Sequence, residues 1–226
     1  MCGRYTYFSS EDVLKEFDLE KSNDLQLALD IPDNYNVSPG AHMPVIVRGT
    51  QGHKVEFMIW GLVPSWSKTS ETTLKLINAR RESLLEKPMW KRLVKSKRCI
   101  VPARGFYEWK AEHGQKNPYY ITPVVDKVFS FAGLWDEWHD EHGSELTTFT
   151  IITTNPNKKM ATIHSRMPAI LTKDKMDRWL EPVDLSQTEL DDLLKPVSYE
   201  HIHIERVSTK VNNVRNNSED LIYPLE

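Results

Sequence analysis

The sequence predicts an α+β fold in a single domain spanning 1–226, with a mainly antiparallel β-sheet or distorted barrel and flanking helices. Three observations support this. A chain of 226 residues is long enough for one domain with a substantial core. Short segments rich in aromatic and β-branched residues outnumber the amphipathic helical ones. Helices are interspersed among these segments but do not alternate with them, as a parallel α/β sheet would require.

The expected helices show apolar stripes or capping signals. Val13 and Phe17 lie on one stripe of the first helix, and Ser10 is its expected N-cap. The second ends before Pro88, because the residue preceding a proline disfavours the α conformation. Asn155 starts a third, short helix, with proline at its first position. The helices are expected over 11–19, 80–86, from 155, over 174–180 and over 187–195.

The expected strands are apolar or alternating runs bounded by Gly, Asn and Pro. They are 45–47, 55–60, 98–103, 105–110, 118–122, 127–134, 146–153 and 202–207.

Composition limits the class of protein. Hydrophobic residues make up 39% and charged residues 27%, as in soluble globular proteins. No apolar run reaches the length of a membrane span, and the N-terminus has no signal-peptide pattern, so we expect a cytoplasmic protein. The net charge of −3 gives no argument for nucleic acid, and the basic run 91–98 is more typical of a solvated helix face. Metal-binding clusters, Walker loops and dinucleotide fingerprints are absent from the sequence, so no cofactor or metal is expected.

Cys2 is the most informative residue of the chain. Removal of Met1 would give it a free α-amine beside its thiol. An α-amine has a pKa of about 7.7–8.0, so it is partly neutral and nucleophilic at physiological pH. Such a 1,2-aminothiol reacts readily with aldehydes, because the thiol closes a five-membered ring on the imine. A cysteine placed there by chance is the alternative. Cys99 lies in an apolar stretch and is expected to be a buried structural thiol with no disulfide.

Several turns combine polar or aromatic residues with Gly and Pro. Trp66 is expected to be exposed and able to stack on an unpaired base, whereas Trp60 is expected to pack in the core. Asn78 either caps the helix after it or contributes, with Arg80, to a phosphate or sugar site. Glu108 lies among aromatic residues, where burial would raise its pKa and suit a general acid; an edge-strand carboxylate facing water is the alternative.

His164 and Arg166 are two residues apart and would point to the same side of an extended segment. Histidine moves protons near neutral pH, and arginine binds phosphate in bidentate fashion. The amide-rich segment 207–217 either contacts a nucleic-acid backbone or forms a polar turn.

Together these motifs closely resemble the SRAP family (SOS response-associated peptidases, the abasic-site processing proteins). The resemblance runs from Cys2 to about Ile222 and rests on seven segments in order: 1–5, 35–40, 60–66, 77–80, 105–109, 163–168 and 211–216.

The resemblance implies a covalent DNA–protein cross-link. Family members bind abasic sites in single-stranded DNA, and the ring-opened sugar is an aldehyde. The resemblance makes Cys2 the nucleophile, Glu108 the acid and base, His164 an aid to ring opening and reversal, and Asn78 a hydrogen-bond donor to the adduct. It implies a thiazolidine product, a lyase side reaction and peptidase chemistry that exposes Cys2.

The resemblance also implies a DNA-binding surface. Three arginines would contact flanking phosphates, and Trp66 with Pro39 would stack on or wedge beside bases. The DNA-binding set is Arg4, Asn36, Pro39, Trp66, Arg80, Arg166, Lys210 and Arg215. The expected partner is single-stranded DNA containing abasic sites, with no membrane partner. The expected protein is a monomer, associated with the nucleoid during DNA damage in a bacterial cell.

Two other functions fit parts of the sequence. An N-terminal-nucleophile glutaminase also exposes Cys2 followed by Gly3, and would release ammonia from glutamine. A single-stranded DNA-binding module without chemistry would leave Cys2 and Glu108 without a role.

Overall fold

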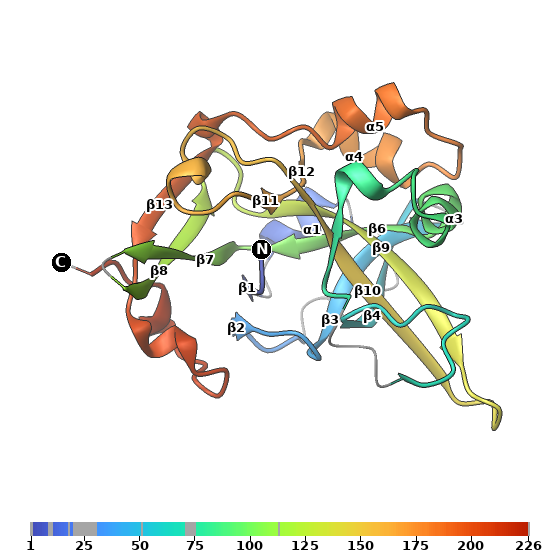
Figure 1. Cartoon of the computed structure of the whole chain (residues 1–226), viewed down its shortest axis with the longest axis horizontal. Coiled ribbons are helices and arrows are strands. Elements are labelled where there is room, and N and C mark those ends of the chain that lie inside the picture. Colours follow the sequence, from blue (N-terminus) through green and yellow to red (C-terminus); the bar gives the residue numbers. More distant parts are fainter. Residues whose placement is uncertain are drawn as a thin grey trace.

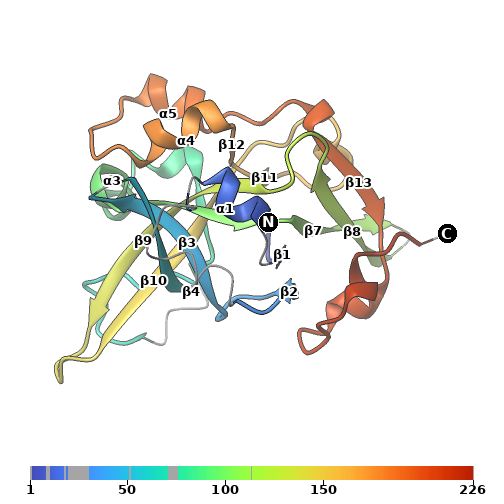
Figure 2. The same ribbon diagram turned by 180° about the vertical axis from the view of Figure 1, so that it is seen from behind.

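The computed structural model describes residues 2–8, 11–17, 19, 31–50, 52–70, 76–112 and 114–225. Figures 1 and 2 show two lobes joined through the strands beside the N-terminus, one carrying β8, β13 and the C-terminal segment and the other carrying α3, α4 and α5. The expected α+β class is confirmed. In the described part of the chain, no helix has both the length and the apolar character needed to cross a membrane.

The smaller sheet has five strands in the order β13-β8-β7-β1-β2. Every pairing in it is antiparallel. Its strands are β1 (Arg4–Tyr7), β2 (Asn34–Val37), β7 (Gly105–Glu112), β8 (Gln115–Pro123) and β13 (Ile202–Arg206).

The larger sheet has eight strands, and five of them close a ring. β4 pairs β3, β3 pairs β6, β6 pairs β9, β9 pairs β10, and β10 returns to β4 in parallel. Its strands are β3 (His42–Gly49), β4 (Gly52–Trp60), β5 (Asn78–Arg80), β6 (Arg98–Ala103), β9 (Phe129–His139), β10 (Glu145–Thr154), β11 (Met167–Pro168) and β12 (Ile170–Leu171).

The helices cover one side of the ring. In α3, Pro88 occupies the first turn and the buried stripe is Trp90, Leu93 and Val94. In α5, Ser186 and Glu189 form a capping box. The bounds are α1 (Glu11–Glu16), α3 (Pro88–Ser96), α4 (Lys173–Leu180) and α5 (Gln187–Leu193), with 3₁₀ turns at Arg81–Ser83, Met160–Thr162, Tyr199–His201, Thr209–Asn212 and Glu219–Ile222.

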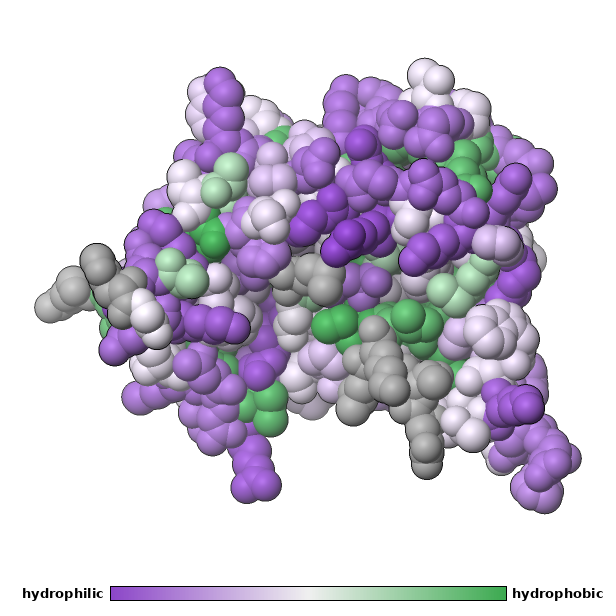
Figure 3. Space-filling model, in the orientation of Figure 1, coloured by the Kyte–Doolittle hydropathy of each residue, from purple (hydrophilic) through white to green (hydrophobic). Residues whose placement is uncertain are grey.

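The two larger of the three buried hydrophobic clusters in the described part of the chain position the site. One joins the helices to the outer side of the ring through residues such as Trp179 and Leu134. The other lies between the ring and the smaller sheet and contains Cys2, Tyr5 and Phe131. Most of the face in Figure 3 is hydrophilic, with its widest hydrophobic patch near the centre.

Two helix predictions are wrong. The segment predicted as a helix over 80–86 is the end of β5 followed by a 3₁₀ turn at Arg81–Ser83, because β5 pairs β10 from Ile151 to Thr153. Asn155 does not start a helix; the helical turn begins at Met160, where Asn157 Oδ1 accepts the Met160 N–H at 2.9 Å. The expected N-cap Ser10 lies outside the described residues.

Candidate active site

Cys2 lies two residues before β1, which pairs β7 through Arg4 with Tyr107 and Tyr5 with Phe106. Extending this antiparallel register by two residues would place Cys2 opposite Trp109, the residue after Glu108 on β7, at a strand spacing of about 4.7–4.9 Å. The Cys2 side chain is 0% exposed. Neither Cys2 nor Cys99 forms a disulfide, as expected, and Cys99 is buried.

Asn78 contacts Cys2 across 76 residues of chain. Its Nδ2 donates to the Cys2 carbonyl oxygen at 2.9 Å. Its Oδ1 is buried, and no hydrogen-bond donor of the described residues reaches it. Asn78 opens strand β5, and the 3₁₀ turn after that strand has Arg80 at its N-cap position, so the alternative of a helix-capping Asn78 is wrong.

Glu108 is 2% exposed on β7, so it is not an edge carboxylate facing water. Burial raises its pKa, and the nearby His164 opposes that rise. The Cys2 thiol responds in the same direction: burial raises its pKa, and the negative charge of Glu108 adds to the effect. Burial therefore favours the protonated form of both groups, and the thiol and the carboxyl group influence each other's ionisation.

His164 follows a tight turn in which the N–H groups of Ile163 and His164 both donate to Met160 O, at 2.9 and 2.8 Å. Its Nδ1 accepts the Arg166 backbone N–H at 3.0 Å and lies 3.9 Å from Glu108 Oε1. The same Nδ1 lies 3.3 Å from the Arg166 carbonyl oxygen, so the backbone of Arg166 holds the ring in place. The chain bends at Ser165, so the expected extended conformation of residues 164–166 is wrong.

Glu108 and His164 meet at a cavity of about 540 Å³. It is lined by Glu108, Trp109, Lys116, His164 and Asn212, and Trp109 Nε1 donates to Asn212 Oδ1 at 2.7 Å. No specific signal in the sequence points to Lys116, and Asn212 is only one of many amides in its segment. A carboxyl group and an imidazole near a cysteine are the kinds of groups that can move protons during addition to a carbonyl.

Arg4 and Asn36 hold the C-terminal segment in place. Arg4 Nη1 donates to Asn36 Oδ1 at 2.7 Å and to Val211 O at 2.9 Å. Asn36 is 4% exposed, and its Nδ2 donates to the carbonyl oxygens of Val211, Asn213 and Asn216 at 3.3, 3.1 and 3.0 Å. Both side chains thus have intramolecular partners, and DNA contact by either one stays a prediction.

Arg166 also has intramolecular partners. Its guanidinium forms a bidentate pair with Glu82 at 2.8 and 3.0 Å and donates to Thr153 O at 2.5 Å. The β5–β10 register places Arg80 opposite Thr153, so both arginines approach that residue. The Arg80 side chain is exposed, and no hydrogen bond or ion pair among the described residues engages its guanidinium.

The remaining predicted DNA-binding residues lie on the surface. Trp66 is 69% exposed, as expected, whereas Trp60 is fully buried and donates from Nε1 to Ile77 O at 2.9 Å. Pro39 is half-buried in the turn before β3. Lys210 pairs with Asp220 at 2.8 Å, and Arg215 is exposed in the same C-terminal segment.

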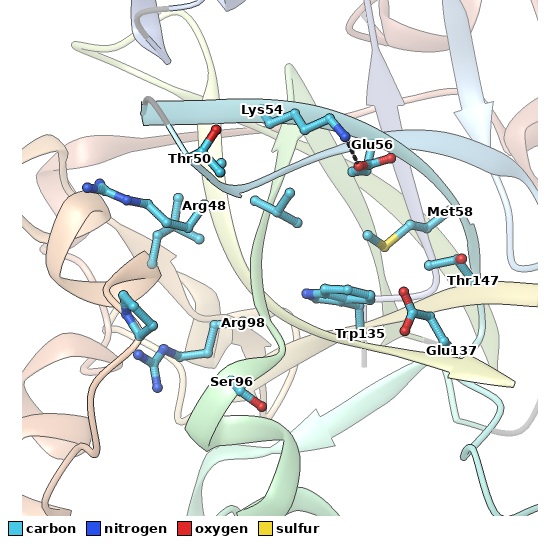
Figure 4. A pocket seen from close by; sticks show the side chains of 14 residues that line it. Arg48, Thr50, Lys54, Glu56, Met58, Ser96, Arg98, Trp135, Glu137 and Thr147 are labelled. Carbon is cyan, nitrogen blue, oxygen red and sulfur yellow. Dashed lines mark hydrogen bonds and ion pairs between the residues drawn. The ribbon is translucent and has the colours of Figure 1, made fainter.

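A larger cavity of about 670 Å³ lies at the β3–β4 hairpin end of the ring and contains none of the predicted site residues (Figure 4). Lys54 pairs with Glu56 at 2.5 Å there, and Glu137 pairs with Lys97 at 3.0 Å. Within the described ranges, no group of three or more His, Cys, Asp or Glu residues is arranged to hold a metal ion.

Comparisons with known proteins agree with the sequence resemblance. A family model described as SOS response associated peptidase (SRAP) matches residues 1–214. The abasic site processing protein YoqW of Bacillus subtilis (strain 168) is 38% identical over 229 residues, covering 98% of this chain and 99% of YoqW. The abasic site processing protein HMCES of Gallus gallus is 37% identical over 193 residues, covering 75% of this chain and 57% of HMCES.

The fold is also shared. A crystal structure of a protein from Bacteroides thetaiotaomicron matches with a TM-score of 0.87 at 30% identity and covers 100% of both chains. Sequence model, relatives and fold therefore lead to one conclusion: the chain belongs to the SRAP (SOS response associated peptidase) family.

Proposed function

We propose that this protein captures abasic sites in single-stranded DNA by a covalent bond to Cys2. The observation that carries the proposal is the meeting of Cys2, Asn78 and Glu108, with the Asn78 amide 2.9 Å from the Cys2 carbonyl oxygen and a buried carboxyl beside the thiol. The names of YoqW and HMCES as abasic site processing proteins support the choice of electrophile.

The first step needs a free amine, so Met1 must be removed; we propose that the family's peptidase chemistry is this self-processing. The Cys2 α-amine then adds to the aldehyde of the ring-opened sugar. The carbinolamine loses water to give an imine. Glu108, whose raised pKa keeps a proton available, donates that proton to the departing hydroxyl.

The second step closes the ring. The Cys2 sulfur bonds to the carbon of the protonated imine left by the loss of water, and the C=N π electrons move to nitrogen, giving a neutral thiazolidine. Because burial raises the thiol's pKa, the thiol must lose its proton to a base as it attacks. Glu108 is a carboxylate after the first step and can accept that proton, which makes one residue serve both steps.

His164 and Asn78 have supporting roles in the proposal. The imidazole of His164 donates to the deoxyribose oxygen as the sugar ring opens, and the same path runs backwards on reversal. Asn78 fixes the Cys2 carbonyl and so orients the amine. The imine also permits elimination of the 3′ phosphate, a lyase side reaction that thiazolidine closure suppresses. We propose that the protein acts as a cytoplasmic monomer, reaching the nucleoid with damaged DNA.

A denaturing gel with an abasic oligonucleotide tests the proposal. The wild-type protein should give a heat-stable shifted band without borohydride. Cys2→Ala retains the α-amine, so it should give a band only after borohydride reduction, with more strand cleavage. A stable cross-link from Cys2→Ala without reductant would exclude the thiazolidine.

The same preparation discriminates the other two functions. Intact mass shows whether Met1 is gone and whether the DNA mass is added. Ammonia release from glutamine, with no DNA adduct, would instead identify a glutaminase. Binding of the oligonucleotide with neither an adduct nor ammonia release would leave a DNA-binding module without chemistry.

A further inference from the structure

A basic pocket lies beside the candidate active site, and none of the residues considered so far as DNA ligands belongs to it. It measures about 490 Å³ and is lined by Lys158, Lys159, Thr162, His203 and Ile204. Tyr199, which is 40% exposed, lies between its two lysines: both Nζ atoms are 5.9 Å from the ring centroid. We call Lys158, Lys159, Thr162, Tyr199 and His203 the Lys158 patch.

The Lys158 patch is close to the catalytic cavity. Thr162 precedes His164 by two residues, and two residues of chain span at most about 7 Å. In Figures 1 and 2 the turn before His164 lies over β13, the edge strand of the smaller sheet. Across that sheet Ile204 aligns with Ile121 and then Phe106, two residues before Glu108 on the same face. One continuous strand of nucleic acid can therefore touch both places.

The lysines of the Lys158 patch are available for an anion. Lys159 Nζ donates one hydrogen bond to Ile202 O at 2.9 Å, which leaves two of its three N–H donors. Among the described residues, no carboxylate lies within ion-pair distance of Lys158 or Lys159. His203 differs, because Glu205 lies 3.1 Å from its Nε2, so the positive charge of the patch comes from the lysines.

The basic run 91–98 provides a contrast. Arg92 pairs with Asp136, Lys95 with Asp184 at 3.5 Å, and Lys97 with Glu137 at 3.0 Å. Its charge is therefore largely neutralised within the protein, as expected for a solvated helix face.

Ammonium groups around an exposed aromatic ring fit single-stranded DNA. Lysines neutralise backbone phosphates, and an aromatic face stacks on a base whatever its sequence. We propose that the Lys158 patch binds the DNA strand on one side of the abasic nucleotide, with Lys158 and Lys159 on phosphates and Tyr199 under a base. This inference rests on the proposed function, because the cavity it adjoins is taken as the abasic-sugar site.

The test uses two abasic oligonucleotides, one with a long flank only 5′ of the abasic site and one with a long flank only 3′ of it. For one of the two, Lys158→Ala/Lys159→Ala should weaken binding on the order of tenfold at 0.1 M salt and reduce the log–log salt slope by about 1.4, the value for two single-strand contacts. The other oligonucleotide should bind as it does to the wild type. Lys158→Arg/Lys159→Arg keeps both positive charges and should bind both oligonucleotides as the wild type does.

Control variants distinguish DNA binding by the Lys158 patch from the effects of lost charge elsewhere or of lost stability. Lys91→Ala/Lys95→Ala removes the same charge from α3 and should change neither oligonucleotide's affinity. Tyr199→Ala should lose at least about fivefold on the same oligonucleotide as the lysine variant, whereas Tyr199→Phe should retain its affinity. Lys158→Ala alone leaves the Lys159 hydrogen bond intact and should show a smaller loss on the same oligonucleotide, with an unchanged melting temperature.

Equal affinity of the lysine variant and the wild type for both oligonucleotides would overturn the inference, and so would an equal loss on both. The proposed function is read separately, from cross-linking of a short abasic oligonucleotide by the wild type. The flank measurements can be repeated on oligonucleotides without an abasic site, so failure of the cross-link does not hide the outcome for the Lys158 patch.

Discussion

At the scale of single residues, Glu108 shows how surroundings set the chemistry of a carboxyl group. The strand β7 also carries Glu112, four residues on, which accepts a hydrogen bond from Asn117 and pairs with Lys110 at 2.6 Å. The hydrogen bond from Lys110 lowers the pKa of Glu112, whereas burial raises that of Glu108. Two glutamates on one strand therefore have pKa values that are shifted in opposite directions.

Glu108→Gln should therefore stabilise the protein in a pH-dependent way. The pKa of Glu108 is higher in the folded state than in an unfolded chain, where it is about 4.3. The folded protein holds the extra proton between the two values, so the wild type's free energy of unfolding falls as pH rises through that window. Glutamine does not ionise. We expect equal melting temperatures near pH 4 and a growing advantage for Glu108→Gln as pH rises.

Glu112→Gln is the matched control, because its lowered pKa predicts the opposite trend: stability relative to wild type falls as pH rises through the lowered value. Thermal unfolding from pH 3 to 8 measures both variants. Parallel curves for Glu108→Gln and the wild type would show that Glu108 is not held in its neutral form by burial. Cross-linking by Glu108→Gln at neutral pH should meanwhile be slowed more than DNA binding is weakened.

At the scale of elements, the loop that carries Trp66 is fixed by side chains of β9 and β10. Asp136, 2% exposed on β9, accepts the Ser65 N–H at 2.9 Å and also pairs with Arg92. Trp138 Nε1 donates to Ser67 O at 2.7 Å, and Thr148 Oγ1 accepts the Val63 N–H at 2.9 Å. An exposed aromatic side chain on such a supported loop is preorganised for stacking.

Asp136→Ala should loosen this loop. It removes the carboxylate that accepts the Ser65 N–H, and a hydrogen bond to a charged acceptor is worth about 1.5–3 kcal/mol. We expect faster amide exchange over 61–67 and weaker binding of single-stranded DNA, although Asp136 touches no DNA in the proposal. Glu137→Ala, which removes an exposed carboxylate from the adjacent position, should change both quantities little. Unchanged exchange over 61–67 in Asp136→Ala would show that the loop does not depend on this contact.

At the scale of the whole molecule, Arg4 and Asn36 join the two ends of the chain at the active site. Arg4 bonds Val211 O across 207 residues, and Asn36 bonds the Asn216 carbonyl across 180. Because Arg4 lies two residues from Cys2 and Asn212 lines the catalytic cavity, this contact fixes both sides of the site. The C-terminal segment is thus a wall of the site.

Asn36→Ala should cost roughly 2 kcal/mol of unfolding free energy, about 1 for each of the two Nδ2 N–H donors that are shared among three carbonyl oxygens. Urea unfolding measures this loss, and amide exchange over 209–217 should rise with it. Asn36→Asp keeps the acceptor for Arg4 but not the donors, so it tests the two halves of the contact separately. Asn213→Ala removes an exposed side chain and should change stability by less than about 0.5 kcal/mol. A loss that small for Asn36→Ala would show that Asn36 does not hold the C-terminal segment in place.

Much of the fold was predictable because its signals are local. The strand at 98–103 was predicted to the residue, and the burial of Trp60 and Cys99 and the exposure of Trp66 are confirmed. Alternation, apolar stripes and prolines act within a few residues, so they can be identified from the sequence alone. The same local reasoning failed over 80–86, because pairing of β5 with β10 overrides helix propensity there.

The sequence by itself determined the fold class, the family and the identity of the candidate nucleophile. Only the tertiary structure decided that Asn78 bonds the Cys2 carbonyl, that Arg4 and Asn36 hold the C-terminal segment, and that Arg166 pairs with Glu82. The physical reason is separation along the chain. These contacts join residues 76, 207 and 84 positions apart, so they exist only once the strands have paired and closed the ring.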